Sequence, residues 1–344
     1  MEQRIDWVDT LKGIGIFLIV WGHYLENGWL RDYIFSFHVP LFFFVSGYLF
    51  NHKKHSHFSV FFKKRFKSII VPYLFFSFIS LGYVILKGSI GEIQGFSFPL
   101  YKPILGIFYS IGANPWLIHN IALWFLTCLF IVEITYFYIN KMTSKKTTLI
   151  LLLLTFSIVG YIISIIPLIR LPWSIDIAFT AIVFYGVGHL YRGHVDIKRK
   201  YLFVPLFILS FLFSNLNRGV DMNYLAYGNY FYFYISAFSG IFLFIIISQL
   251  INKNFIFAFL GINSLIILGL HLHWLIERSS ADIIISLTNV STTIIATSIF
   301  WSFIMTSIAI ILIFPLIFII NKYIPFIIGK SYVRINQTNF KKME

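Results

Sequence analysis

Charged residues are scarce in this chain, and cysteine is almost absent. Only 12% of its 344 residues are Asp, Glu, Lys or Arg, whereas 58% are hydrophobic and 20% are aromatic. A soluble core could not bury that much apolar surface, so the composition excludes an ordinary soluble domain. The single cysteine, Cys128, stands in an apolar run, which excludes an internal disulfide and leaves the redox compartment undetermined. The lack of an internal repeat weakens the case for an inverted-repeat transporter without excluding one.

Long apolar runs are what the chain has instead. About 20 apolar residues cross a bilayer, so the length accommodates about ten spans with short loops and no separate soluble domain. Runs able to span occur at residues 11–29, 33–50, 69–87, 118–140, 147–168, 176–191, 201–215, 229–250, 255–275 and 296–320. The predicted fold is an all-α, polytopic transmembrane helix bundle over residues 1–325, with a basic cytoplasmic tail at 326–344. The Gly- and Pro-containing stretch 88–117 is expected to be an irregular or partly re-entrant external loop.

The net charge of +14 could indicate a nucleic-acid partner, and the distribution of the basic residues tests this. In membrane proteins, Lys and Arg gather in cytoplasmic loops beside anionic lipid. With the N-terminus inside, 21 of the 27 basic residues fall in inner segments and 6 in outer ones. The sequence therefore predicts ten spans with both termini cytoplasmic, contact with membrane lipid, and no nucleic-acid partner.

The first span carries two ionisable residues on one face. Lys12 and His23 are eleven residues apart, which at 100° per residue is only about 20° more than three full helical turns. Along the helix axis, the same spacing separates Lys12 from His23 by roughly 16 Å. Lys12 should therefore lie at the cytoplasmic rim and His23 in the outer half of the bilayer. Ionisable groups inside spans are costly, so each one is a functional candidate.

Other titratable residues are expected in the same outer layer as His23. The second span returns after a short turn, which places His38 at a depth similar to that of His23. A histidine in a low-dielectric setting tends to stay neutral and can accept a proton from a hydroxyl. We therefore expect His23 and His38 to be catalytic. Asp176, His271 and His119, which should lie at the outer ends of their helices, are predicted to bind substrate.

A basic segment after the second span lies on the same side as Lys12. Residues 63–67 read Lys-Lys-Arg-Phe-Lys, and such a run usually anchors a helix among lipid headgroups. Together with Lys12, however, Arg65 and Lys67 would form a cationic mouth suited to a nucleotide phosphate. No Gly-rich Walker pattern accompanies them, so ATP hydrolysis is not indicated.

The histidine pairs do not indicate a metal site. His271 and His273 are separated by one residue, as are His55 and His57. Neither pair has carboxylate or Cys ligands at a recognised spacing. The sequence therefore predicts no metal.

Six segments of the sequence are distinctive when they are taken together in their order along the chain. The most specific is the block at 4–23, which has a basic residue, ten intervening positions and a histidine, here Lys12 and His23. The others are FHVPLFFFVSGYLF at 37–50, FFKKRFKSIIVPY at 61–73, LWFL at 123–126, LPWSIDIAF at 171–179 and INSLIILGLH at 262–271. In this order they resemble the acyltransferase-3 family of integral membrane O-acyltransferases, particularly its fucose O-acetylase-like branch. The resemblance extends over nearly the whole chain.

The resemblance implies a catalytic His23, an acyl-CoA donor, commonly acetyl-CoA, and an acceptor hydroxyl. That hydroxyl would belong to a cell-surface glycan or its lipid-linked sugar precursor. The implied location is a bacterial cytoplasmic membrane, where the protein would act alone or with separate glycan-assembly proteins as partners. Relatives often have Arg where this chain has Lys12, which keeps the charge but loses the bidentate geometry for phosphate.

Two other functions remain open at the level of sequence. A transporter or flippase for a glycolipid or a small polar solute would also use ten spans with buried polar groups. A non-catalytic assembly or sensing protein would tolerate the loss of His23. Thioester hydrolysis or acyl transfer by the purified protein separates the enzyme from both.

Overall fold

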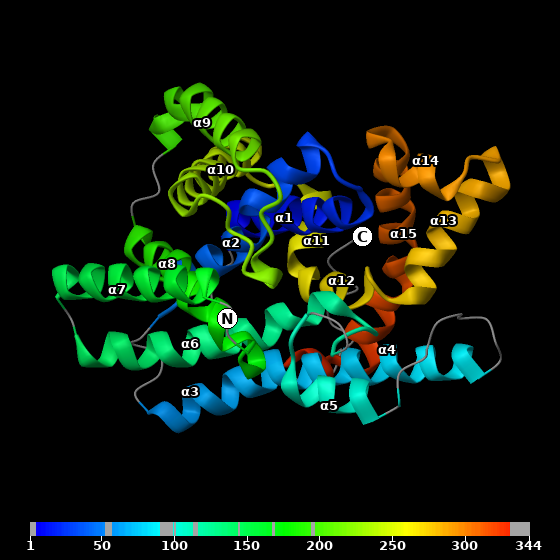
Figure 1. Cartoon of the computed structure of the whole chain (residues 1–344), viewed down its shortest axis with the longest axis horizontal. Coiled ribbons are helices and arrows are strands. Elements are labelled where there is room, and N and C mark those ends of the chain that lie inside the picture. Colours follow the sequence, from blue (N-terminus) through cyan, green and yellow to red (C-terminus); the bar gives the residue numbers. More distant parts are fainter. Residues whose placement is uncertain are drawn as a thin grey trace, which may run out of the picture.

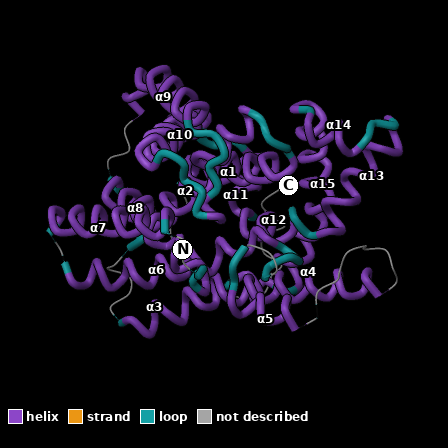
Figure 2. The backbone as a smooth tube through the Cα atoms, in the orientation of Figure 1, coloured by secondary structure: helices purple, strands orange, loops and turns teal. Residues whose placement is uncertain are grey.

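The computed structural model describes residues 5–51, 57–89, 99, 101–112, 116–143, 145–166, 169–193 and 197–330. Throughout these ranges the chain forms helices and connecting loops and no β-strand, which confirms the predicted all-α class (Figure 2). The α-helices are α1 (Asp6–Tyr24), α2 (Trp29–Leu49), α3 (Phe58–Arg65), α4 (Val71–Ser89), α5 (Tyr101–Tyr109), α6 (Trp124–Met142), α7 (Lys146–Ile165), α8 (Ile175–Tyr191), α9 (Phe203–Leu216), α10 (Tyr230–Ile251), α11 (Phe255–Ile262), α12 (Ser264–Leu270), α13 (Trp274–Thr288), α14 (Thr292–Thr297) and α15 (Ile299–Tyr323).

Several of these helices are long and apolar enough to cross a membrane. Seven segments of the described chain meet that condition: 29–49, 58–88, 121–142, 146–165, 172–191, 230–251 and 299–323. The other three predicted spans correspond to α1, which carries Asp6, Asp9 and Lys12, to the shorter α9, and to α11 with α12. The multi-span bundle is thus confirmed, while the count of ten and the orientation stay predictions.

Helices α1 and α11 lie side by side (Figure 1), and at their contact they approach so closely that only glycine fits. A Cβ atom on Gly13 of α1 would overlap the carbonyl oxygen of Phe257 in α11. On the same interface, a Cβ atom on Gly261 would overlap the carbonyl oxygen of Asp9. Small residues commonly permit such close backbone contact between membrane helices. This contact fixes the position of α1, the helix that carries Lys12 and His23.

Helices α2 and α8 meet in the same way. A Cβ atom on Gly47 would overlap the carbonyl oxygen of Tyr185, and one on Gly188 would overlap that of Phe44. Gly47 belongs to the segment 37–50 that carried the sequence resemblance. One reason for a glycine in that segment is therefore the packing of α2 against α8.

Some connections depart from the expectation. The stretch 88–117, expected to be irregular, contains α5. The run 255–275 is broken at Asn263, whose φ and ψ of −105° and 12° separate α11 from α12. The Asn263 side chain donates to the Phe259 carbonyl and accepts from Asn321, so a polar residue at this point is satisfied outside a regular helix.

Two helices lie beyond α12 at the predicted outer side. Asn289, with a φ of 56°, ends α13, and Ser291 caps α14 before the chain returns through α15. Charged residues of α13, including Glu277 and Asp282, are exposed. These helices were not predicted as separate elements, because α13 is too polar to resemble a span and α14 is too short.

The helical body extends slightly past residue 325. A short 3₁₀ helix, η7 (Pro325–Ile328), buries Ile327 and Ile328 against α4 and the π-helix η2 (Phe66–Ile70). The predicted cytoplasmic tail begins here, and its part from 331 to 344 lies outside the described residues.

The uneven distribution of basic residues makes the topology testable. Reporter fusions after residues 58, 144 and 196 should give cytoplasmic signals, and fusions after 100 and 222 should give external signals. Paired alkaline phosphatase and fluorescent protein fusions measure both sides at each position. A reversed pattern at any two of these positions would exclude the ten-span arrangement.

Candidate active site

The final turn of α1 brings His23 to a point where three cavities meet. His23 lines an inner cavity of about 170 Å³, a polar outer cavity of about 180 Å³ and a wider outer cavity of about 590 Å³. A side chain common to all three can contact molecules that arrive by different routes. We name these spaces the inner, polar outer and wide outer cavities.

The inner cavity connects Lys12 to His23, as their shared helix face predicts. Its wall is otherwise mainly apolar, with Phe42 of α2 and Phe125 of α6 among its residues. Ser68 of η2 also lines it, next to the exposed Lys67. The inner cavity therefore has a cationic group at one end, an imidazole at the other, and an apolar passage between them.

Two further histidines adjoin His23. Its ring centroid lies 6.3 Å from that of His38 and 5.3 Å from that of His271. His38 is 3% exposed and His271 is fully buried, whereas His23 is only partly buried. The three imidazoles come from α1, α2 and the end of α12, so the packing of distant segments produces the cluster.

Backbone carbonyls fix the tautomers of the two buried rings. His38 Nδ1 donates to the Ile34 carbonyl at 2.8 Å, and His271 Nδ1 donates to the Leu268 carbonyl at 2.9 Å. A carbonyl oxygen only accepts, so each Nδ1 carries hydrogen, and in a neutral ring Nε2 then has a free lone pair. His271 Nε2 is buried and has no hydrogen-bond partner among the described residues. It can accept a hydrogen bond from a neighbouring group such as His23.

The polar outer cavity lies above His23 and His38. Arg31, in the first turn of α2, lines it together with Trp124 at the start of α6. Asp221 and Asn223, from the loop between α9 and α10, complete its polar wall. Positive and negative charge are therefore both present here.

The wide outer cavity is bordered by α13, α14 and the end of α1. Its charged residues are Glu26, Glu277, Arg278 and Asp282, with three acidic groups against one basic group. Such a wall disfavours an anionic ligand. The excess negative charge distinguishes it from the inner cavity, where Lys12 is the charged residue.

A comparison with protein families shows to which family a chain with this site belongs. A family model described as an acyltransferase domain matches residues 5–328. The chain belongs to the acyltransferase-3 family. No curated protein and no solved structure matches it. The suspected membership is confirmed, whereas the fucose O-acetylase-like branch stays a prediction.

As an acyltransferase-3 protein, the chain is a membrane acyltransferase, and its two most specific sequence positions, Lys12 and His23, line one cavity. The segment LWFL at 123–126 also contributes to the site. Trp124 lines both the inner and the polar outer cavities, and Phe125 lines the inner one. The resemblance therefore coincides with the walls around His23.

The predicted donor-binding residues are not equivalent. Arg65 forms a 2.8 Å ion pair with Glu133, whose side chain is 3% exposed. A buried carboxylate requires such a partner, so Arg65 has a structural task in addition to any contact with the donor. Lys67 is exposed, and Lys12 lines the inner cavity. Lys12 and Lys67 are consequently the better probes of donor binding.

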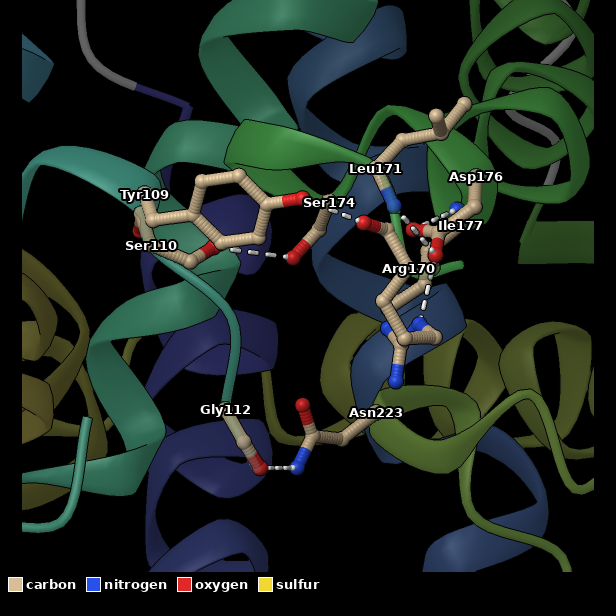
Figure 3. A network of polar contacts seen from close by, with 9 residues as sticks. All are labelled: Tyr109, Ser110, Gly112, Arg170, Leu171, Ser174, Asp176, Ile177 and Asn223. Atoms are coloured by element: carbon tan, nitrogen blue, oxygen red, sulfur yellow. Dashed lines mark hydrogen bonds and ion pairs between the residues drawn. The ribbon is translucent and has the colours of Figure 1, made fainter. Parts of the chain in front are cut away.

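Asp176 takes part in a different network from the histidine cluster (Figure 3). Its carboxylate pairs with Arg170 and accepts from the backbone N–H groups of Leu171 and Ile177. Asp176 does not line any of the three cavities described above. Its contact with substrate stays a prediction, and its observed contacts fix the turn before α8.

This network also reaches the outer wall. Ser174, in the turn held by Asp176, donates to the Ser110 carbonyl at 3.3 Å. Asn223 donates to the carbonyl of Gly112 in the same segment. Asp176 can therefore influence the polar outer cavity through the segment 110–112, which is held from both sides (Figure 3).

His119 is separate from the three cavities. It is 1% exposed, and neither ring nitrogen has a partner among the described residues. The next residue, Asn120, donates to the Gly269 carbonyl at 2.8 Å, which links this loop to α12. The substrate-binding role assigned to His119 stays a prediction.

The described residues contain no group of three His, Cys, Asp or Glu side chains that could hold a metal ion. Three histidines do meet at His23, but the Nδ1 atoms of His38 and His271 are engaged by backbone carbonyls. The absence of a metal from the reaction stays a prediction.

Three residues around His23 were not predicted as part of the site: Arg31, Asp221 and Asn223. Arg31 could have been singled out as one of the few basic residues on the outer side. Asp221 and Asn223 stand in a short loop rich in Asn, Asp and Gly, which indicates a turn but not its position over α1 and α2.

Proposed function

We propose that the protein transfers an acetyl group from acetyl-CoA to a hydroxyl of a cell-surface glycan or of its lipid-linked sugar precursor. The observation that carries this proposal is the position of His23, which lines the inner cavity with Lys12 and both outer cavities. A cationic inner end suits the polyanionic CoA, and the outer cavities lie on the side of the glycan in the charge-derived topology.

In the proposed reaction, His23 is the general base. It accepts the proton of the acceptor hydroxyl as that oxygen attacks the thioester carbonyl. The carbon–sulfur bond then breaks, an ester forms, and the leaving CoA thiolate receives the proton from the His23 imidazolium. The reaction consumes the thioester and the alcohol and needs no further reactant.

The neighbouring histidines would hold His23 in a productive state. His271 Nε2 can accept a hydrogen bond from one His23 nitrogen, which would leave the other nitrogen basic. Tyr24 donates to the His271 carbonyl at 2.7 Å and so joins the end of α1 to this segment. His38 would act as the second catalytic histidine, facing the acceptor from the polar outer cavity.

The sidedness of the substrates provides the direct test of this function. We expect acetyl transfer in vesicles of known orientation when acetyl-CoA is confined to the Lys12 side and the acceptor to the opposite side. Product analysis by mass spectrometry measures the transfer. Product formation only when both substrates share the Lys12 side would exclude transfer across the membrane and favour a cytosolic reaction on a lipid-linked sugar.

Donor binding should depend on the basic residues of the inner side. Replacement of Lys12 or Lys67 by Met should raise the KM for acetyl-CoA up to about fivefold, since an exposed ionic contact contributes up to about 1 kcal/mol. The KM for the acceptor should change less, and added salt should have the same effect as the substitutions.

Lys253→Met is the matched control, because Lys253 is exposed at the predicted inner side but neither lines the inner cavity, as Lys12 does, nor adjoins a residue that lines it, as Lys67 does. Equal effects of the three substitutions would show that Lys12 and Lys67 are not part of the donor site. Arg65→Met is less informative, since it also leaves Glu133 without its ion-pair partner.

A further inference from the structure

Several residues that line the polar outer cavity are not among the residues predicted to form the site. Arg31 and Asp221 supply opposite charges, Asn223 supplies an amide, and Trp124 and Tyr224 supply aromatic surface. Tyr224 is 53% exposed, whereas Trp124 is 6% exposed, so the wall runs from the surface to the interior. His23 and His38 complete this cavity at its inner end.

The loop that carries Asp221 and Asn223 is internally braced. Asp221 exchanges two backbone hydrogen bonds with Ala226, at 2.8 and 3.0 Å. Asn217 donates to the carbonyls of Tyr227 and Asn229 and accepts from the Asn229 N–H. These bonds give the loop a defined shape, so its side chains are positioned before any ligand binds.

The loop is also anchored to its surroundings. The Gly219 N–H donates to Asp32 of α2 at 3.1 Å, and the Asn223 amide donates to the Gly112 carbonyl. Both anchors are hydrogen bonds to segments distant in sequence. The loop therefore forms a fixed part of the outer wall.

The polar groups of this wall still have hydrogen-bonding sites that a ligand could use. One Asp221 oxygen accepts from the Asn223 N–H at 2.9 Å, and a carboxylate has further acceptor sites. Asn223 is 5% exposed, and its side-chain oxygen has no partner among the described residues. Burial raises the pKa of the Asp221 carboxyl, while the Asn223 N–H and the charge of Arg31 act in the opposite direction.

The charges of the cavity nearly cancel. The guanidinium of Arg31 lies 3.9 Å from the ring centre of Phe35 and faces a cavity that also contains Asp221. Arg170, which also acts on Asp221 electrostatically, is paired with Asp176. One positive and one negative side chain therefore remain, and neither a strongly anionic nor a strongly cationic ligand is favoured.

We propose that the polar outer cavity is the acceptor subsite and that it binds one uncharged sugar ring. The proposal rests on the function proposed above and specifies its substrate class. Asp221 and the Asn223 oxygen would accept hydrogen bonds from ring hydroxyls, Arg31 would donate to them, and Trp124 would cover an apolar face of the ring. The hydroxyl nearest His23 would be the one acetylated.

The size of the cavity agrees with a single ring. Its volume of about 180 Å³ is below the roughly 300–1,000 Å³ of pockets for drug-sized ligands. The rest of a glycan would have to lie outside it. The wide outer cavity also reaches His23, but three of its four charged residues are acidic groups that only accept hydrogen bonds when ionised, and Arg278 is its one basic residue.

The test compares Asp221→Asn with Asp32→Asn. Asparagine at 221 keeps an oxygen that can accept the Asn223 N–H but removes the charge. Asp32 binds the same loop through Gly219 and does not line the cavity. The substitution Asp32→Asn therefore measures only the structural effect of a changed contact to the loop. Methyl glycosides of a neutral hexose, a uronic acid and an amino sugar serve as acceptors.

We expect the wild type to prefer the neutral glycoside. Asp221→Asn should raise the KM for that glycoside about tenfold and improve the relative use of the uronic acid, since Arg31 then lacks its counter-charge. Asp32→Asn should resemble the wild type in all these measurements.

An unchanged acceptor KM in Asp221→Asn, or equal losses in both variants, would overturn the subsite. Saturation-transfer NMR with the neutral methyl glycoside and no acetyl-CoA tests the subsite independently of the reaction. Binding lost in Asp221→Asn but kept in Asp32→Asn supports it, and binding unaffected by Asp221→Asn overturns it. If the wild type neither transfers nor hydrolyses acetyl-CoA, the proposed function fails while this binding result still decides the subsite.

Discussion

His23→Ala is expected to abolish acyl transfer while the protein still inserts into the membrane. A general base contributes about 10²–10⁴-fold to the rate, so kcat should fall by at least that range. The backbone hydrogen bonds of α1 do not involve the imidazole, and the helix should remain formed. Mass spectrometry of the acetylated acceptor, with membrane fractionation, measures both results.

Two control substitutions test whether the loss of activity is specific to the catalytic base. His38→Ala should cause a smaller loss, because His23 remains beside the donor passage. His57→Ala removes an exposed imidazole at the predicted inner side and should leave activity unchanged. Added imidazole should restore part of the activity of His23→Ala, which a merely structural role would not explain. Wild-type turnover by His23→Ala would exclude the assignment.

Gly13→Ala is expected to disrupt the bundle around α1, although alanine is normally the better helix former. The added methyl group would overlap the backbone carbonyl of Phe257, and backbone atoms cannot move aside as a flexible side chain can. Overpacking costs about 1–3 kcal/mol and more where the helices must separate. The detergent-solubilised protein should therefore show a markedly lower Tm and a smaller monodisperse peak in size-exclusion chromatography.

Gly82→Ala provides the matched control in α4. A Cβ atom at Gly82 meets nothing within 4 Å, so the same chemical change should be neutral or stabilise the helix by up to about 1 kcal/mol. Because Gly13 adjoins Lys12, its replacement should also reduce acyl transfer in the protein that remains folded. A Tm and an activity equal to those of wild type would show that α1 and α11 do not pack as closely as described.

The helical class and most helix positions could be predicted from the sequence, because apolar runs of span length have few alternative structures in a membrane. The relation between Lys12 and His23 was also predictable, since both belong to one helix and the helical repeat fixes their directions. The departures, such as α13 and the break at Asn263, occur where a helix ends at polar residues. There, contacts with other segments decide the geometry.

The sequence by itself determined the membrane class and the family, and it singled out His23 as the candidate base. Only the tertiary structure decided which polar residues surround that histidine: it placed His271 and Asp221 there, and left Asp176 and His119 in other environments. Helical periodicity fixes where a side chain points on its own helix, but not which helix packs against that face. That choice depends on close contacts between distant segments, such as those at Gly13 and Gly261, whose partners become visible only once the chain is folded.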